Sequence, residues 1–186
     1  MVASPTHRYE HTGNALLDRV QDNVRRLIAS VVQLVVVVEA RRVVSLMLEE
    51  DFTTTAATAQ STKLSFAVVK GESWDVEVCG NGGCSTVDGM KYAIACPAGS
   101  VLSGELDSSS ANIAVANWTR QALTASTLSA ATHVGATNAG RPDRINARVT
   151  VGADGFITLQ AASATAADTT TVYAKTYLRA SKVTLV

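Results

Sequence analysis

The apolar residues of this chain follow a helical repeat in its first forty residues and a strand-like repeat after that. Seven of them are spaced alternately by three and four residues, which is a heptad pattern. They are Leu17, Val20, Val24, Leu27, Val31, Leu34 and Val38. Beyond Arg42 the apolar residues alternate with period two or form short runs. We therefore predict two parts, an N-terminal anchoring and oligomerisation segment at residues 1–42, with a helix at about 14–34, and a β domain at residues 43–186.

The heptad residues give the predicted helix an apolar face, which further apolar neighbours widen. These neighbours are Leu16, Ile28, Val32 and Val35. A self-associating helix and a helix packed on its own domain both explain the pattern, and seven consecutive matches favour self-association. Because a wide apolar face suits three helices better than two, we expect a short coiled coil that forms a homotrimer. Asn14 is the expected N-cap, and the four valines at 35–38 suggest that the last turn is already extended.

Short runs rich in β-branched residues predict the strands of the second part. The predicted strands are residues 43–52, 63–69, 73–79, 90–96, 101–106, 113–123, 144–151, 156–161, 171–178 and 182–186. Turn signals separate them, among them Gly-Asn-Gly-Gly at 80–83 and Asp154-Gly155. The segment around Asp154-Gly155 gives the clearest hairpin. Strands of this length and spacing predict a mainly β protein, an antiparallel β-sandwich of jelly-roll-like type.

Charge and hydropathy exclude some partners and favour others. Lys and Arg number 16 and Asp and Glu number 16, so the formal net charge is zero, whereas nucleic-acid-binding domains are usually basic. The apolar run at 27–38 is shorter than the roughly twenty residues of a membrane span. We therefore expect no nucleic-acid partner and no membrane span. A weakly charged, neutral surface also favours an oligomer, which removes apolar surface from water.

The three cysteines leave several interpretations open. Cys79 and Cys84 flank the predicted turn at 80–83, so a disulfide between them is sterically possible. Free or packed thiols are the favoured interpretation, and a metal site the least favoured, because the histidines share no ligand spacing with the cysteines. Cys79 and Cys96 lie at predicted strand ends, so they could also approach each other. The histidines are His7, His11 and His133. We expect no bound metal and no cofactor.

No motif for catalysis is evident, so we expect a protein that is not an enzyme. The acidic run at 49–51 cannot converge on one site, because adjacent strand residues point to opposite faces. Trp74 and Trp118 are either core anchors, which we favour, or the floor of a sugar-binding face. Tyr173 and Tyr177 are expected on one face of one strand, in a core or a subunit interface.

The order of the strand motifs resembles a known β domain. Leu64-Ser65-Phe66 and the strand of Trp74 precede Lys91-Tyr92-Ala93 and Pro97-Ala98-Gly99. Two closing segments follow, Gly-Phe-Ile-Thr-Leu-Gln-Ala at 155–161 and Val-Tyr-Ala-Lys-Thr-Tyr-Leu-Arg-Ala at 172–180. This resembles the β-sandwich domain at the C-terminal end of many virion structural proteins of tailed bacteriophages.

The resemblance covers about residues 43–186 and implies a role in the particle without an active site. It implies a short fibre, spike or decoration protein on the surface of the virion, with other virion proteins of the capsid or tail as partners. The alternative is a carbohydrate- or host-surface-binding module, such as a receptor-binding tip that takes a host glycan. Residues 1–42 and the segment at 79–84 lie outside the resemblance.

Overall fold

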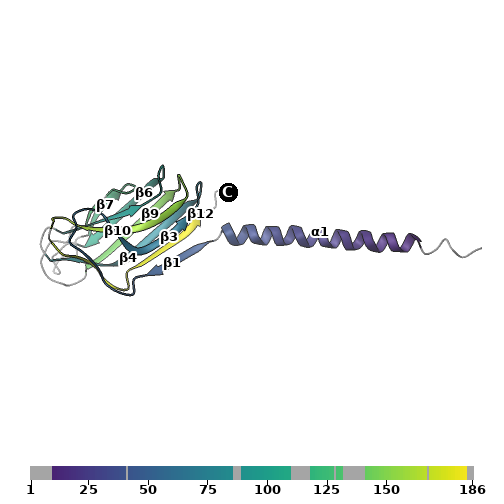
Figure 1. Cartoon of the computed structure of the whole chain (residues 1–186), viewed down its shortest axis with the longest axis horizontal. Coiled ribbons are helices and arrows are strands. Elements are labelled where there is room, and N and C mark those ends of the chain that lie inside the picture. Colours follow the sequence, from purple (N-terminus) through teal and green to yellow (C-terminus); the bar gives the residue numbers. More distant parts are fainter. Residues whose placement is uncertain are drawn as a thin grey trace, which may run out of the picture. The chain divides into compact units, whose positions relative to one another are not determined.

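The computed structural model of the chain describes residues 10–40, 42–85, 89–109, 118–127, 129–131, 141–166 and 168–183. The elements in these ranges are one helix and twelve strands (Figure 1). They are α1 (Glu10–Ala40), β1 (Val43–Met47), β2 (Phe52–Thr54), β3 (Gln60–Val68), β4 (Ser73–Cys84), β5 (Met90–Ala95), β6 (Val101–Ser109), β7 (Trp118–Leu123), β8 (Ser129–Ala131), β9 (Arg141–Thr150), β10 (Gly155–Ser163), β11 (Thr170–Val172) and β12 (Tyr177–Val183). Backbone contacts divide the chain into two compact units, Met1–Arg41 and Arg42–Val186.

The helix α1 is longer than its sequence pattern indicated. It runs without interruption over 31 residues, so the expected N-cap Asn14 lies inside it and the valines at 35–38 are helical rather than extended. Valine lowers helix propensity by only a few tenths of a kcal/mol per residue, which is too little to end a helix. Among the described residues, no helix combines the length and the apolar character that crossing a membrane requires.

The second unit consists of two antiparallel sheets. The large sheet has the strand order β1-β12-β4-β9-β6-β7. The short strand β11 pairs with the C-terminal end of β4 on one side and with β2 on the other, so both short strands belong to this sheet. The small sheet has the order β3-β10-β5-β8. The prediction of a mainly antiparallel β domain is thereby confirmed. The jelly-roll connectivity and the coiled coil stay predictions.

One core lies between the two sheets, built by the period-two pattern of the strands. On β9, Ile145 and Val149 are buried while Arg144, Asn146 and Arg148 are exposed, so only one face of this strand meets the core. Trp74 is fully buried, and its ring meets that of Phe66 edge-on at 5.1 Å. The core interpretation of Trp74 is confirmed.

The predicted hairpin at Asp154-Gly155 is wrong. β9 belongs to the large sheet and β10 to the small sheet, so residues 151–154 cross from one sheet to the other. Hydrogen bonds hold this crossing against the turn between β3 and β4: the Lys70 N–H donates to Asp154 and the Gly71 N–H donates to the carbonyl of Val151, at 2.8 and 2.9 Å. Asp154 therefore stabilises the turn between β3 and β4 instead of closing a hairpin between β9 and β10.

Other strand boundaries also differ from the prediction. The segment 43–52 is divided into β1 and the start of β2, and the segment 171–178 into β11 and the start of β12. Each division comes from a short turn, and the two turns bind each other through the Leu48 N–H, which donates to the carbonyl of Thr176. The predicted last strand, 182–186, is in its described part the end of β12.

The predicted turn at 80–83 is instead the continuation of β4, which runs unbroken from Ser73 to Cys84. Glycine is needed here because side chains from β5 of the facing sheet and from the adjacent strand β9 lie directly over the backbone. A Cβ at Gly82 would collide with the Met90 sulfur, the Tyr92 hydroxyl and the Asp143 carboxylate. The glycines thus permit close packing across a strand, and no reversal of the chain occurs.

Candidate functional site

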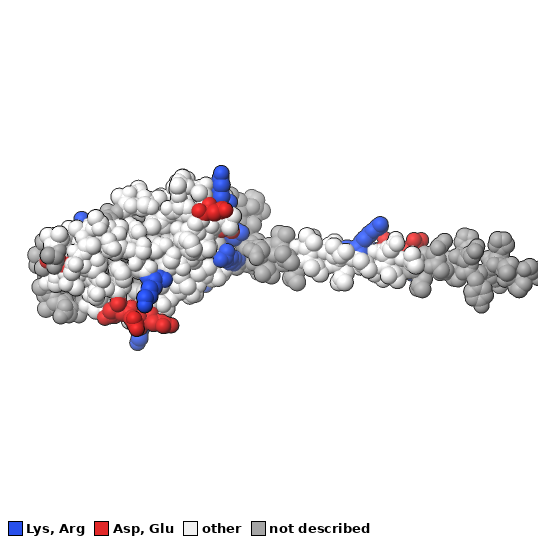
Figure 2. Space-filling model, in the orientation of Figure 1, with Lys and Arg blue, Asp and Glu red and all other residues white. Residues whose placement is uncertain are grey.

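The apolar stripe of α1 is exposed throughout its described part. We call the seven heptad residues the stripe. The exposed fraction of its five described side chains ranges from 48% at Val24 to 66% at Leu27. The flanking Ile28 and Val32 are exposed as well. Leu34 and Val38 lie in the helix, but their side chains are outside the described residues. Figure 2 shows the described part of α1 as mostly uncharged on the side in view.

A helix of this kind has little to stabilise it in a single chain. At 1.5 Å per residue it is about 46 Å long, and its described side chains make one ion pair, a 3.9 Å contact between Arg25 and Asp22. Most helical stability in proteins comes from packing of an apolar face rather than from propensity. Burying one Leu or Val side chain is worth about 1.5–3 kcal/mol. The stripe is therefore a surface whose burial would stabilise α1.

A second candidate surface is the outer face of the large sheet, which is covered with charged residues. We call these residues the charged grid. The grid consists of Asp75, Glu77, Glu105, Asp107, Arg120, Arg144, Arg148 and Arg179. Strand register sets its rows: Asp75 lies opposite Arg148, and Asp107 lies between Arg144 and Arg120. Unlike charges thus alternate across β4, β9, β6 and β7, which is a stabilising cross-strand arrangement.

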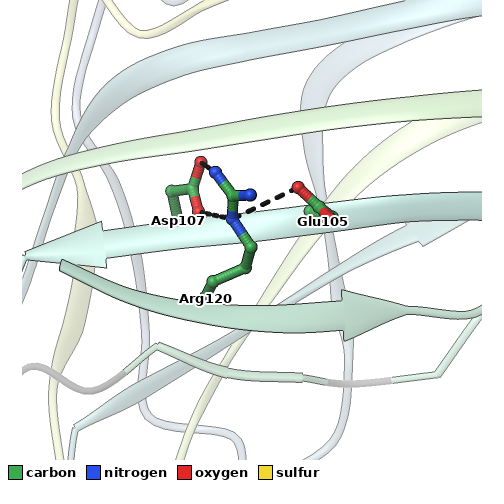
Figure 3. A network of polar contacts seen from close by, with 3 residues as sticks. All are labelled: Glu105, Asp107 and Arg120. Atoms are coloured by element: carbon green, nitrogen blue, oxygen red, sulfur yellow. Dashed lines mark hydrogen bonds and ion pairs between the residues drawn. The ribbon is translucent and has the colours of Figure 1, made fainter.

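Most members of the grid are locked in ion pairs. Arg148 Nε lies 2.8 Å from Asp75 Oδ1, and Arg144 donates to Glu77 Oε1 at 2.8 Å. Figure 3 shows Arg120 lying between two acids of the neighbouring strand, with its Nε 2.9 Å from Asp107 and 3.2 Å from Glu105. Hydrogen bonding to the partner carboxylate raises the pKa of Arg120 and of Arg148 above the usual arginine value. Because these pairs are exposed, they orient side chains more than they stabilise the fold.

A shallow groove crosses the grid along β4 and β9. Among its lining residues are Asp75, Glu77, Arg144, Asn146, Arg148, Arg179 and Ser181. Two of its three arginines are paired with its two carboxylates, while Arg179 forms no ion pair with any side chain that the structure describes. The groove therefore has one cation in excess and several fixed hydrogen-bonding groups. The sequence pattern did not single out this surface, because its residues become neighbours only through the order of the strands in the sheet.

The cysteines do not form the hairpin disulfide. All three are free thiols, and Cys79 and Cys84 lie in the same unbroken strand. Five residue-to-residue steps of extended strand place the two Cα atoms about 16 Å apart, well beyond the roughly 7 Å limit for a bridge. Burial raises the pKa of Cys96 to about 11. In the residues that the structure describes, no group of three or more His, Cys, Asp or Glu could hold a metal ion.

The structure also brings together residues that the sequence did not connect. The Tyr92 hydroxyl on β5 donates a 2.8 Å hydrogen bond to Oδ2 of Asp143 on β9, and both residues are buried. Burial and the neighbouring carboxylate raise the pKa of Tyr92 well above its usual value. A small cavity adjoins this pair, beside Gly80 and Thr176. The pair joins the two sheets, and no ligand role is needed to explain it.

The remaining candidate residues are scattered. The acidic run is exposed, with Glu50 3.7 Å from Lys63 and Asp51 accepting from the Ala174 N–H. Tyr173 and Tyr177 do not share a strand, because Tyr173 lies in the turn before β12. His7 and His133 lie outside the described residues, as do the side chains of His11 and Trp118.

Comparison with known proteins identifies no relative by sequence. No family model matches the chain, and no curated protein matches it. Solved structures similar to it include a chain of infectious bursal disease virus Gt strain (8% identity, TM-score 0.16) and one of the infectious bursal disease virus VP2 subviral particle (8% identity, TM-score 0.22). Each match covers 78% of this chain and 38% of the viral chain. TM-scores this low support no argument about fold or function.

Proposed function

We propose that this chain is a non-enzymatic structural component of a tailed-phage particle. In this proposal it is a homotrimeric short fibre, spike or decoration protein on the virion surface, attached to capsid or tail proteins through residues 1–42. The β unit then projects outward. The motifs behind the resemblance support the proposal, and they lie in the β unit, from Leu64-Ser65-Phe66 in β3 to Leu178 in β12.

The observation that carries the proposal is the exposure of the stripe on α1. A single chain leaves at least five apolar side chains of one helix face in water, with exposed fractions near or above one half. Exposed apolar patches of this kind mark protein–protein contacts. A heptad stripe is complementary to copies of itself, because equivalent residues repeat along each helix. Association of three chains would bury the stripe in the oligomer.

Incorporation into particles tests the attachment. Removing residues 1–13 should lower the amount of the chain in purified virions, measured by quantitative mass spectrometry, because this segment is proposed to order against a partner surface. Substitutions in the segment 126–138 are the control and should leave incorporation unchanged. If the control abolishes incorporation and the deletion has no effect, the particle contact lies on the β unit instead.

The groove on the charged grid supports the second candidate function, a glycan-binding module. Arg179 supplies guanidinium donors that form no ion pair with the described side chains, and Asn146 and Ser181 supply further polar groups. One cation in excess favours a saccharide that carries a carboxylate. Isothermal titration with oligogalacturonate and with a neutral dextran of equal length tests this. Arg179→Gln should abolish binding of the acidic chain, whereas Lys63→Gln, an equal charge change on β3, should not. Absence of binding to both probes would remove this candidate.

A further inference from the structure

Among the strands that the structure describes, β1 is an edge strand with one unpaired side. It pairs with β12 and stands at the end of the large sheet. Two hydrogen bonds identify the residues that face β12: the Lys182 N–H donates to the Arg42 carbonyl, and the Leu48 N–H donates to the Thr176 carbonyl, at 2.9 and 2.8 Å. Backbone groups alternate in direction along an antiparallel strand. The intervening odd-numbered residues of β1, Val43, Ser45 and Met47, therefore turn their N–H and C=O groups to the free edge.

The side chains of β1 offer no protection against pairing. Val43 and Met47 are 56% and 60% exposed, and Tyr177, the cross-strand neighbour of Met47, is 38% exposed. Val44 and Leu46 on the other face are half-buried against the core. Edge strands usually carry a charge or a proline that prevents association with another chain. The sequence of β1, Val-Val-Ser-Leu-Met, has neither.

The chain itself ties β1 closely to the stripe helix. Only residues 41 and 42 separate Ala40, the last residue of α1, from Val43, the first residue of β1. At 3.8 Å per Cα step, the Cα of Val43 lies within about 11 Å of the Cα of Ala40. Packed helices are 8–10 Å apart. In an oligomer joined along the stripe, the first residues of neighbouring β1 strands therefore lie within roughly 30 Å of one another.

We propose that the free edge of β1 binds a second copy of this chain, the adjacent β unit of the same oligomer. The outward backbone groups of Val43, Ser45 and Met47 pair with the neighbouring copy, and the side chains of Val43, Met47 and Tyr177 are buried against it. The interface continues the one made by the stripe. This inference rests on the proposed self-association of α1 and adds the surface that orients the β units toward each other.

Residue-resolved amide hydrogen exchange tests the proposal with a control inside the same strand. In the full-length oligomer the amides of Val43, Ser45 and Met47 should exchange at least tenfold more slowly than in Leu27→Asp, which places a carboxylate in the stripe. The alternate amides of Val44, Leu46 and Leu48 point to β12, so they should be protected equally in both proteins. Sedimentation of the same samples gives their masses.

Each outcome separates this proposal from the proposed function. An oligomer whose outward amides exchange as fast as those of Leu27→Asp has a free β1 edge, which overturns this inference and leaves the stripe intact. A wild-type monomer overturns both. An oligomeric Leu27→Asp with protected outward amides supports the β1 contact and overturns association through the stripe.

A pair of matched variants tests the side-chain contribution. Met47→Lys adds a charge at the proposed contact and should raise the dissociation constant of the oligomer at least tenfold. Val101→Lys makes a similar change at an equally exposed residue of β6 and should leave the dissociation constant within twofold. Equal constants for the two variants would contradict burial of Met47. Circular dichroism verifies that both variants are folded.

Discussion

The hydroxyl of Tyr92 on β5 and Oδ2 of Asp143 on β9 are joined by a 2.8 Å hydrogen bond that links the small sheet to the large sheet. Both residues are buried among the apolar side chains of the core. A buried carboxylate is costly unless it is hydrogen-bonded, and two apolar faces alone permit many relative placements. The bond therefore fixes how the two sheets meet.

Replacing Tyr92 with Phe should reduce the free energy of unfolding by about 1–3 kcal/mol, because Asp143 loses a hydrogen-bond donor inside the core. Urea denaturation at pH 7 measures the change. Tyr177→Phe removes a hydroxyl from a partly exposed tyrosine and should change stability by no more than about 0.5 kcal/mol. Equal losses of unfolding free energy for the two substitutions would show that the buried hydrogen bond stabilises the fold no more than the hydroxyl of Tyr177 does.

Alkaline pH should destabilise the β unit through the same tyrosine. Its pKa in the folded protein is raised well above the ordinary value, so folding keeps Tyr92 protonated where an unfolded chain would lose the proton. The resulting stability is fully present below pH about 10, the pKa of an unfolded tyrosine, and is lost as pH rises toward the folded pKa. Cys96, with its pKa raised to about 11, acts in the same direction above pH 9. The free energy of unfolding, measured by urea denaturation between pH 8 and 11, should fall less steeply with pH for Tyr92→Phe than for the wild type.

Gly82→Ala should destabilise the β unit by about 1–3 kcal/mol or more, since the added methyl group overpacks the core against Met90, Tyr92 and Asp143. The neighbouring Asn81 is exposed, so Asn81→Ala is a control in the same strand. In the double variant with Tyr92→Phe, one of the colliding atoms is absent. The double variant should therefore lose less stability than the sum of the losses of the two single variants. Full additivity in thermal denaturation would contradict the contact.

The glycines of β4 also show where sequence reasoning reaches its limit. Local patterns located the strands well, because alternation along β3, β9 and β10 depends only on which face meets the core. Gly-Asn-Gly-Gly reads as a turn by composition, yet its glycines make room for side chains that are distant in sequence, such as Tyr92 and Thr176. The crossing at Asp154 depends on Lys70 in the same way. These features depend on contacts between residues that are distant in sequence, and such contacts cannot be inferred from the local pattern of a single sequence.

The surfaces were predictable to different degrees. The stripe could be read from the sequence because a heptad pattern is local. The charged grid could not, because Asp75, Arg148 and Arg120 become neighbours only through the strand order β4-β9-β6-β7. The free edge of β1 likewise follows from sheet order.

Glu72 should make the β unit sensitive to acid. Its carboxylate accepts from the Val69 N–H and the Trp74 indole at 2.9 and 3.1 Å, and lies 2.9 Å from Lys182 Nζ. Burial raises its pKa, but these hydrogen bonds and the charge of Lys182 together lower it below the ordinary value. Its stabilising contribution is therefore present above pH about 4.5 and is lost as pH falls through the folded pKa. Glu72→Gln should unfold more easily at pH 7 and lose less stability between pH 6 and 3 than the wild type. If the free energies of unfolding of the two proteins fell equally between pH 6 and 3, this role of Glu72 would be contradicted.

The most direct test of the account is the mass of the full chain in solution, measured by light scattering coupled to size-exclusion chromatography at micromolar concentration. Burial of the stripe predicts about three times the 19.4 kDa of one chain. Leu27→Asp should give a folded monomer, because an unpaired carboxylate is costly to bury in the helix interface. Asp18→Asn, which changes a helix residue outside the stripe, should stay trimeric. A wild-type protein that elutes with the mass of a single chain, indistinguishable from Leu27→Asp, would contradict the account.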